Sequence, residues 1–166
     1  MGNGQIEGPA AALAVAMPAA GRLIGLDLGS KTIGIALSDT RQTVASPLET
    51  LQRQKFAADA DRLVRVISQH GVTGIVLGLP LNMDGSEGPS AQSARAFGRN
   101  FSARCSLPFG FWDERLSTEA VTRTMLEADL SRARRGQIVD KMAAAFILQG
   151  ALDALREARA ANHQQD

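Results

Sequence analysis

The feature that most constrains the fold is a continuous apolar run at residues 73–79 (TGIVLGL). The preceding residues 56–69 are predicted to form an amphipathic helix, because apolar side chains recur on one face of it. Leu63, Val66 and Ile67 show this pattern at the i, i+3, i+4 spacing. A strand that is apolar at successive positions has to be covered on both faces. The sequence therefore predicts an α/β domain with 73–79 as its central strand.

The chain before this helix predicts a group of antiparallel strands. Residues 21–28 (GRLIGLDL) are an apolar run bounded by glycine, and residues 31–38 (KTIGIALS) alternate in polarity. Because only a Gly-Ser pair links the two runs, we expect them to form a hairpin. Residues 43–51 could add an edge strand, interrupted by Pro47. Strands separated by helices pair in parallel, so the whole sheet should be mixed, antiparallel at first and parallel later.

The second half of the chain alternates between helical and extended patterns. Turn residues follow the central strand, and basic residues precede the last helix. The predicted elements are a loop at 80–88, a helix at 89–104, a strand at 107–112, a helix from a Ser117 or Thr118 cap to about Leu130, a basic loop at 131–136 and a long Ala-rich helix at 137–159.

The 166 residues suffice for one domain of ordinary size and not for two. We predict a flexible extension at 1–20, a folded domain at 21–159 and a polar tail at 160–166. Residues 9–20 are apolar like the core of a signal peptide, but Glu7 and no basic residue precede them. No run reaches the roughly 18 apolar residues of a membrane span. The sequence thus favours a cytoplasmic protein that does not enter a membrane.

Charge and metal-ligating residues exclude several classes of protein. Eighteen basic against seventeen acidic residues give a net charge of +1, which excludes a globally basic, histone-like nucleic-acid binder. Cys105 is the single cysteine, and His70 and His163 are the only histidines, so a disulfide framework and Cys- or His-rich metal sites are excluded. Any bound metal would have carboxylate ligands, which favours Mg²⁺ or Mn²⁺.

Three carboxylates lie at positions that make them candidate functional residues. Asp27 lies in an apolar strand, where an ionised carboxylate costs several kcal/mol unless it is paired or bound to metal; a bond within the following turn or to Arg115 would also satisfy it. Glu114 lies where a strand ends, the place at which open α/β sheets bind ligands, although a solvated charge or a salt bridge is an alternative. Asp140 lies in the first turn of the last helix, where the helix dipole alone favours an acid.

The three acids together predict a function more specifically than each does alone. Packing of the later elements against the first strand could bring Glu114 and Asp140 near Asp27. Clustered carboxylates repel one another unless divalent cations neutralise them. Such a cluster fits two-metal hydrolysis of a phosphodiester, in which one metal activates water and the other stabilises the leaving oxygen.

Four segments in this order resemble the YqgF/RuvX family over about residues 21–158. Members are bacterial proteins described as pre-16S rRNA nucleases or Holliday junction resolvases. The resemblance implies a ribonuclease H-like fold and a cytoplasmic nuclease that is a monomer or a homodimer. The segments are Gly25-x-Asp27-x-Gly29-x-Lys31-x-x-Gly34, Gly78-Leu-Pro-Leu-Asn-Met-Asp-Gly85, Asp113-Glu-Arg-Leu-Ser-Thr118 and Val139-Asp140.

The resemblance also implies which residues act. The family's catalytic acids fall on Asp27, Glu114 and Asp140, which would also hold the Mg²⁺ or Mn²⁺ ions. The family is more Asn- and Lys-like before the last acid, where this chain has residues 132–138 (RARRGQI), so local contacts to substrate should differ. The extension at 1–20 has no counterpart in the family core.

Basic and turn residues complete the predicted site. Basic side chains could hold phosphates by charge-assisted hydrogen bonds, although a run of charges is often only solvated. Asn82 and Asp84 could shape the rim or simply form a turn, and Asp39 is a better candidate for a strand-end cap than for a fourth acid. The predicted phosphate-binding residues are Lys31, Arg115, Arg134 and Arg135.

The expected substrate is structured nucleic acid recognised through its backbone, because few large aromatic residues are present to stack bases. The resemblance favours 5′-end maturation of pre-16S rRNA, with a ribosomal particle as a further partner. A junction-specific DNA endonuclease is one alternative, and it would need a dimer. A non-catalytic binding protein in ribosome assembly or transcription is the other.

Overall fold

The computed structural model describes residues 9–116 and 132–163, so the helix predicted from Ser117 or Thr118 to Leu130 lies outside the described residues. In the described part, five strands form one sheet in the order β3-β2-β1-β4-β5. Their bounds are Arg22–Leu28 for β1, Thr32–Ser38 for β2, Ala45–Gln52 for β3, Val72–Leu79 for β4 and Phe109–Asp113 for β5.

The pairing confirms the predicted mixed sheet. Strand β1 pairs antiparallel with β2, and β2 pairs antiparallel with β3. Strand β1 pairs parallel with β4, and β4 with β5. Pro47 lies in β3 opposite Ala36, beside a shift of register, and β3 is an edge strand as its proline requires.

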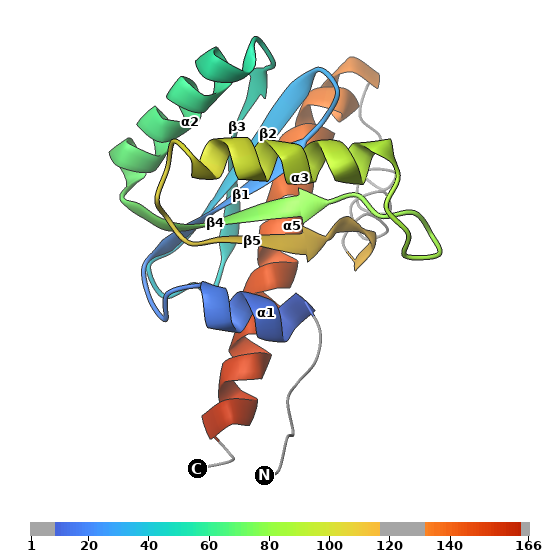
Figure 1. Ribbon diagram of the computed structural model, residues 1–166. Helices are drawn as coiled ribbons and strands as arrows, with labels where there is room; N and C mark the ends of the chain where they lie inside the picture. Colours follow the sequence, from blue (N-terminus) through green and yellow to red (C-terminus); the bar gives the residue numbers. More distant parts are fainter. Residues whose placement is uncertain (1–8, 117–131, 164–166) are drawn as a thin grey trace.

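Helices cover both faces of the sheet (Figure 1). Helices α2 (Phe56–His70) and α3 (Pro89–Ser102) cover one face, and α5 (Arg132–His163) covers the other. Alternate residues of each central strand face opposite sides, so the apolar runs fill two cores at once. No helix within the described ranges has the length and apolar character needed to cross a membrane.

The last helix begins earlier than the sequence predicts. The sequence predicts a basic loop at 131–136 before a helix at 137–159, but α5 extends over Arg132–His163. Alanine and arginine are strong helix formers, and a single glycine such as Gly136 costs a helix only about 1 kcal/mol. The basic residues therefore continue the helix instead of interrupting it.

The N-terminal extension also differs from the prediction. The sequence predicts a flexible segment at 1–20, whereas Pro9–Ala16 form helix α1 and Leu13 and Met17 are buried. Leu13 rests on Gly110 of β5 so closely that a Cβ there would lie 2.4 Å from its Cδ2 atom. Two apolar residues four positions apart thus dock this short helix on the sheet and on α5.

Candidate active site

The site lies at one edge of the sheet, where parallel strands end together. Asp27 is the next-to-last residue of β1, and Glu114 directly follows β5 in the short 3₁₀ helix η1 (Glu114–Leu116). Strand β4 lies between them and pairs Leu77 with the residue that precedes Asp27. The carboxyl ends of β1, β4 and β5 therefore bring residues far apart in sequence to one place.

Gly78 of β4 allows the two acids to meet. A Cβ at Gly78 would lie 2.5 Å from Oε1 and 3.0 Å from Cγ of Glu114, and 2.8 Å from Cδ1 of Ile147. The carboxyl of Glu114 thus lies over the bare glycine backbone, on the face of the sheet that α5 covers. This role of Gly78 was not predicted from the sequence, although an isolated glycine inside an apolar strand is a known signal for such a close approach.

Asp27 and Glu114 interact directly. Burial, together with the negative charge of Asp27 and a hydrogen bond to Asp27, raises the pKa of Glu114 from 4.5 to about 8. The protonated Glu114 donates that hydrogen bond to the Asp27 carboxylate. Asp27 thus has Glu114 as a partner, and the two acids share a proton near neutral pH, as close carboxylates do when no cation separates them.

The backbone of α5 brings the position of Asp140 to the same end of the sheet. Arg159, near the C-terminus of α5, donates to the carbonyl of Pro18, which lies close to the start of β1. Further back along the helix, the carbonyl oxygen of Ala144 would lie 3.1 Å from a Cβ on Gly25. Helix α5 therefore runs antiparallel to β1, and its N-terminal part points toward the end of β1 that carries the acids. Asp140 belongs to this part, and its side chain lies outside the described residues.

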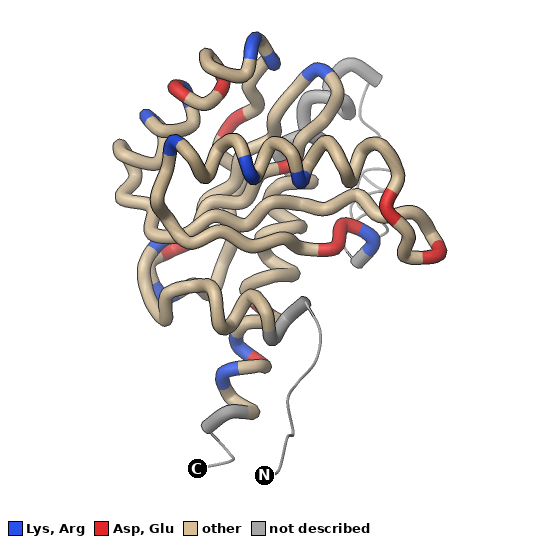
Figure 2. Tube along the Cα trace, in the orientation of Figure 1, with Lys and Arg blue, Asp and Glu red and all other residues tan. Residues whose placement is uncertain are grey.

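Arg115 forms a clamp with Asp113 around Glu114. Its guanidinium donates to the Asp113 carboxylate at 2.7 and 3.0 Å, and its backbone N–H donates to the same group at 3.0 Å. It also donates to the carbonyl of Met83 at 3.3 Å. These hydrogen bonds lower the pKa of Asp113 and hold η1 against the 80–88 loop. Figure 2 shows acidic and basic residues side by side in this segment.

The other predicted phosphate-binding residues lie near the site or outside the description. Lys31 is exposed in the turn between β1 and β2, next to the end of β1. Arg134 and Arg135 belong to the first turn of α5, and their side chains lie outside the described residues. Phosphate binding by Lys31, Arg115, Arg134 and Arg135 stays a prediction.

The remaining polar candidates, Asn82, Asp84 and Asp39, make hydrogen bonds that stabilise local turns. Asp84 accepts from the N–H and the hydroxyl of Ser86, and these bonds lower its pKa, while Asn82 donates to the same hydroxyl. Asp39 accepts from Thr43 and Val44 after β2, which confirms the predicted strand-end cap. The hydrogen bonds of Asn82 and Asp84 thus make the 80–88 loop an ordinary turn.

The donor set fits a hard divalent cation. Among the described side chains, no three His, Cys, Asp or Glu residues gather as a ready-made metal site. Asp27 and Glu114 nevertheless place oxygen ligands together, and their mutual repulsion is what a cation would remove. The pair lacks the nitrogen and sulfur ligands of a typical zinc site.

Comparison with known proteins matches most of the chain. Residues 21–154 match the family model RuvX, described as Holliday junction resolvase. A protein of Rhodobacter capsulatus named "Putative pre-16S rRNA nuclease" is 59% identical over 142 residues, 86% of this chain and 89% of the relative. One of the same name from Paramagnetospirillum magneticum is 61% identical over 132 residues, 80% of this chain and 85% of the relative.

A solved structure agrees on the fold. The structure of Thermus thermophilus RuvC in complex with Holliday junction substrate aligns with a TM-score of 0.55. The alignment covers 82% of this chain and 96% of that one, at 14% identity. Such low identity supports the arrangement of helices and strands alone.

Proposed function

Because the chain belongs to the RuvX family and has the ribonuclease H-like fold that the sequence predicts, we propose that it is a divalent-metal-dependent nuclease acting on the 5′ end of pre-16S rRNA. The observation that carries this proposal is the contact of Asp27 with Glu114 at the carboxyl ends of parallel strands. A raised carboxyl pKa beside a second carboxylate is typical of functional sites. The names of the relatives supply the substrate, since the geometry is compatible with any phosphodiester.

Asp27, Glu114 and Asp140 would hold two Mg²⁺ or Mn²⁺ ions, with Asp27 shared between them. Bound there, the ions would lower the pKa of a water molecule and stabilise the leaving oxygen of the phosphodiester. Asp27 and Glu114 must give up their shared proton to act together as ligands. The clamp between Asp113 and Arg115 keeps Glu114 in place while they do so.

The surroundings of the acids would position the substrate. Lys31 is exposed in the turn that follows β1, and the basic first turn of α5 precedes Asp140. Cations around an acidic site hold phosphates without reading bases, which suits a structured RNA bound through its backbone. Arg115 would contribute to phosphate binding only by sharing the hydrogen bonds that it makes to Asp113.

The test compares wild-type protein with Asp27→Asn. Both would be incubated with 5′-extended precursor 16S rRNA in Mg²⁺, Mn²⁺ or EDTA, and the products mapped. We expect cleavage that requires metal and is lost in the variant. Equal cleavage by the two proteins, or cleavage in EDTA, would contradict the proposal.

A resolvase acting on DNA junctions is the second candidate, favoured by the description of the family model. Such an enzyme needs two active sites related by symmetry, and therefore a dimer on the junction. Analytical ultracentrifugation with a four-way DNA junction, together with cleavage of that junction, separates the candidates. A monomer that leaves the junction uncut while cutting the RNA would exclude the resolvase.

A further inference from the structure

A groove runs along the outer edge of β5 beside the proposed active site. Its volume is about 550 Å³, within the usual range for small-ligand pockets. Helix α3 and helix α1 lie on either side of β5 (Figure 1). The groove lies between these elements, lined by Phe109, Phe111 and Asp113 of β5, Arg95 of α3, and Ala12 and Ala16 of α1.

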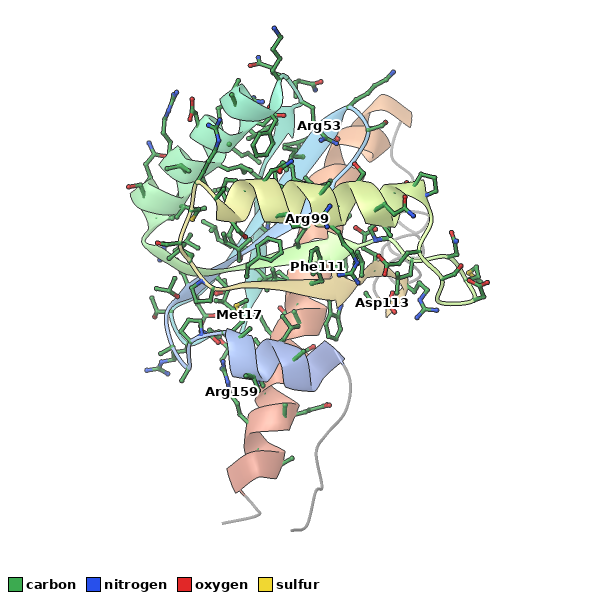
Figure 3. The ribbon with its side chains drawn as sticks, viewed as in Figure 1. Met17, Arg53, Arg99, Phe111, Asp113 and Arg159 are labelled. Atoms are coloured by element: carbon green, nitrogen blue, oxygen red, sulfur yellow. The ribbon has the colours of Figure 1, made fainter. Side chains whose placement is uncertain are left out.

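The alternation of β5 connects this groove to the acids. Phe111 and Asp113 lie along the groove (Figure 3), whereas the intervening Trp112 is buried in the core that α5 covers. The next residue after Asp113 is Glu114, which turns toward Asp27 on the α5 side. The groove therefore ends one residue away from a proposed metal ligand.

The lining is aromatic and apolar, with cations at the end nearest the acids. The rings of Phe109 and Phe111 meet edge to face, 5.0 Å apart at an angle of 82°. The guanidinium of Arg95 lies over the Phe111 ring at 5.0 Å from its centroid, and Arg115 also lines the groove. A matching ligand has a flat, weakly polar part and a negatively charged part.

One wall belongs to the N-terminal helix that the family model does not include. The match begins at residue 21, whereas Ala12 and Ala16 belong to α1. Both are exposed and small, so they leave the groove open. Leu13 and Met17 dock the helix, so the wall is fixed in place.

We propose that this groove binds one unpaired nucleotide of the substrate, with its base against the phenylalanine wall and its phosphate near Arg95 and Arg115. This inference rests on the proposed function in taking nucleic acid as the ligand. Arg95 also pairs with Glu87 and Arg115 with Asp113, so a phosphate would share their hydrogen bonds. An apolar peptide side chain would use neither guanidinium, so the two arginines favour a nucleotide. The groove also ends next to Glu114, where an unpaired nucleotide adjacent to the cleaved bond would lie, and this position favours a nucleotide as the ligand.

The test fills the groove from an exposed position. Ala12→Trp places a large ring into it, and Val15→Trp is the matched control, because Val15 lies on the same helix, is 89% exposed and does not line the groove. The probes are two RNA hairpins, one blunt and one with a single unpaired 2-aminopurine at its 5′ end. Affinity and 2-aminopurine fluorescence would be measured in EDTA at low salt, after thermal melting shows that the variants fold.

We expect wild-type protein to bind the hairpin with the unpaired base about tenfold more tightly than the blunt one and to change its fluorescence. Ala12→Trp should lose this preference and keep its affinity for the blunt hairpin, while Val15→Trp should resemble wild type. Phe111→Leu, which keeps the groove apolar, should lose most of the fluorescence change.

Three results would overturn the inference: no preference in the wild type, no RNA binding, or equal preference in Ala12→Trp and Val15→Trp. Cleavage of precursor RNA by the wild type, assayed in parallel, separates this failure from that of the proposed function. Cleavage with no effect of groove filling would reject the groove alone. A preference sensitive to groove filling without any cleavage would reject the nuclease and keep the nucleotide site.

Discussion

Two carboxylates that follow strands have opposite surroundings. Asp39, after β2, accepts hydrogen bonds from the hydroxyl of Thr43 at 2.6 Å and from the N–H groups of Thr43 and Val44 at 2.7 and 2.9 Å, and these bonds hold its pKa far below the usual range. Glu114, after β5, faces another carboxylate in a buried place, and its pKa rises to about 8. The first is surrounded by donors that stabilise its charge, and the second by features that oppose it.

The two ends of β1 differ in the same way. Near its start, Arg159 donates to Pro18 and to Gln42, and Gln42 donates to the carbonyls of Pro18 and Gly21 (Figure 3 labels Arg159). Near its end, Asp27 has another acid for a neighbour. The first end is built for stability, whereas the second keeps an unfavourable pair that a bound cation would relieve.

The largest expected effect separates the two carboxylates by activity. Glu114→Gln should lower metal-dependent RNA cleavage by about a thousandfold, because losing a metal ligand removes several kcal/mol of transition-state stabilisation. Asp39→Asn should leave cleavage close to wild type and lower the melting temperature, because an amide satisfies fewer of the donors around it. Cleavage rates and melting curves of both variants test the contrast. Full activity in Glu114→Gln would show that its unusual pKa has no catalytic meaning.

A somewhat smaller effect is expected from Gly78→Ala. The added methyl would overlap Oε1 of Glu114 and Cδ1 of Ile147, so the acid has to move. A displacement of about 1 Å at a reacting centre can cost about a hundredfold in rate, and we expect a loss of 10- to 100-fold in cleavage.

Gly71→Ala is the control for Gly78→Ala. Gly71 has a φ of +62° and no atom within 4 Å of the added methyl, so this variant should lose about 1 kcal/mol of stability and keep its activity. If both variants cleave alike, the contact of Glu114 with Gly78 does not position the acid.

The pH dependence of stability follows from the raised pKa of Glu114. In the folded protein this carboxyl keeps its proton up to about pH 8, whereas in the unfolded chain it loses it near 4.5. Its contribution to the free energy of unfolding is therefore present in full below pH 4.5 and is lost as the pH rises to about 8. In EDTA, wild type should lose roughly 2 kcal/mol more than Glu114→Gln over this range, since partial exposure reduces the full effect.

Thermal melting in EDTA between pH 4.5 and 8.5 measures this difference. Mg²⁺ or Mn²⁺ at pH 8 should raise the melting temperature of wild type more than that of Glu114→Gln, because binding to the folded state stabilises it. Parallel pH curves for the two proteins would mean that Glu114 titrates normally.

The sequence predicted most of the fold because local patterns determine most of it. The apolar run at 73–79 and the two-residue link between β1 and β2 led to the observed mixed sheet. The two errors concern α1, which was predicted to be part of a flexible extension, and the start of α5, where a run of basic residues was predicted to be a loop. An Ala-rich segment becomes ordered through Leu13 and Met17, and such docking depends on a surface that the local sequence does not show.

The sequence singled out candidate residues of the site but not the details of its geometry. An acid in an apolar strand, Asp27, and an acid after a strand, Glu114, were identified as candidates, and the structure brings them together, while their catalytic role stays a prediction. Gly78 was missed, because a missing side chain becomes informative only when another group fills the space. Pairing of Arg115 with Asp113 was not foreseen either, since Arg115 was considered as a phosphate-binding residue or as a partner of Asp27. The role of Asp140 stays a prediction.

The smallest expected effect concerns the stable end of β1. Gln42 is buried and has a φ of +58°. Its side-chain amide donates to the carbonyls of Pro18 and Gly21 and accepts from Arg159, and its backbone N–H donates to the carbonyl of Asp39. Gln42→Ala should lower the free energy of unfolding by about 2 kcal/mol, because buried partners lose their bonds. Gln42→Gly should lower it by about 1 kcal/mol less, since glycine accepts a positive φ without strain. Urea unfolding measures both values, and cleavage should stay at the wild-type level in each. A loss of activity without a loss of stability would show that this end of β1 also serves the site, and the contrast between the two ends would then fail.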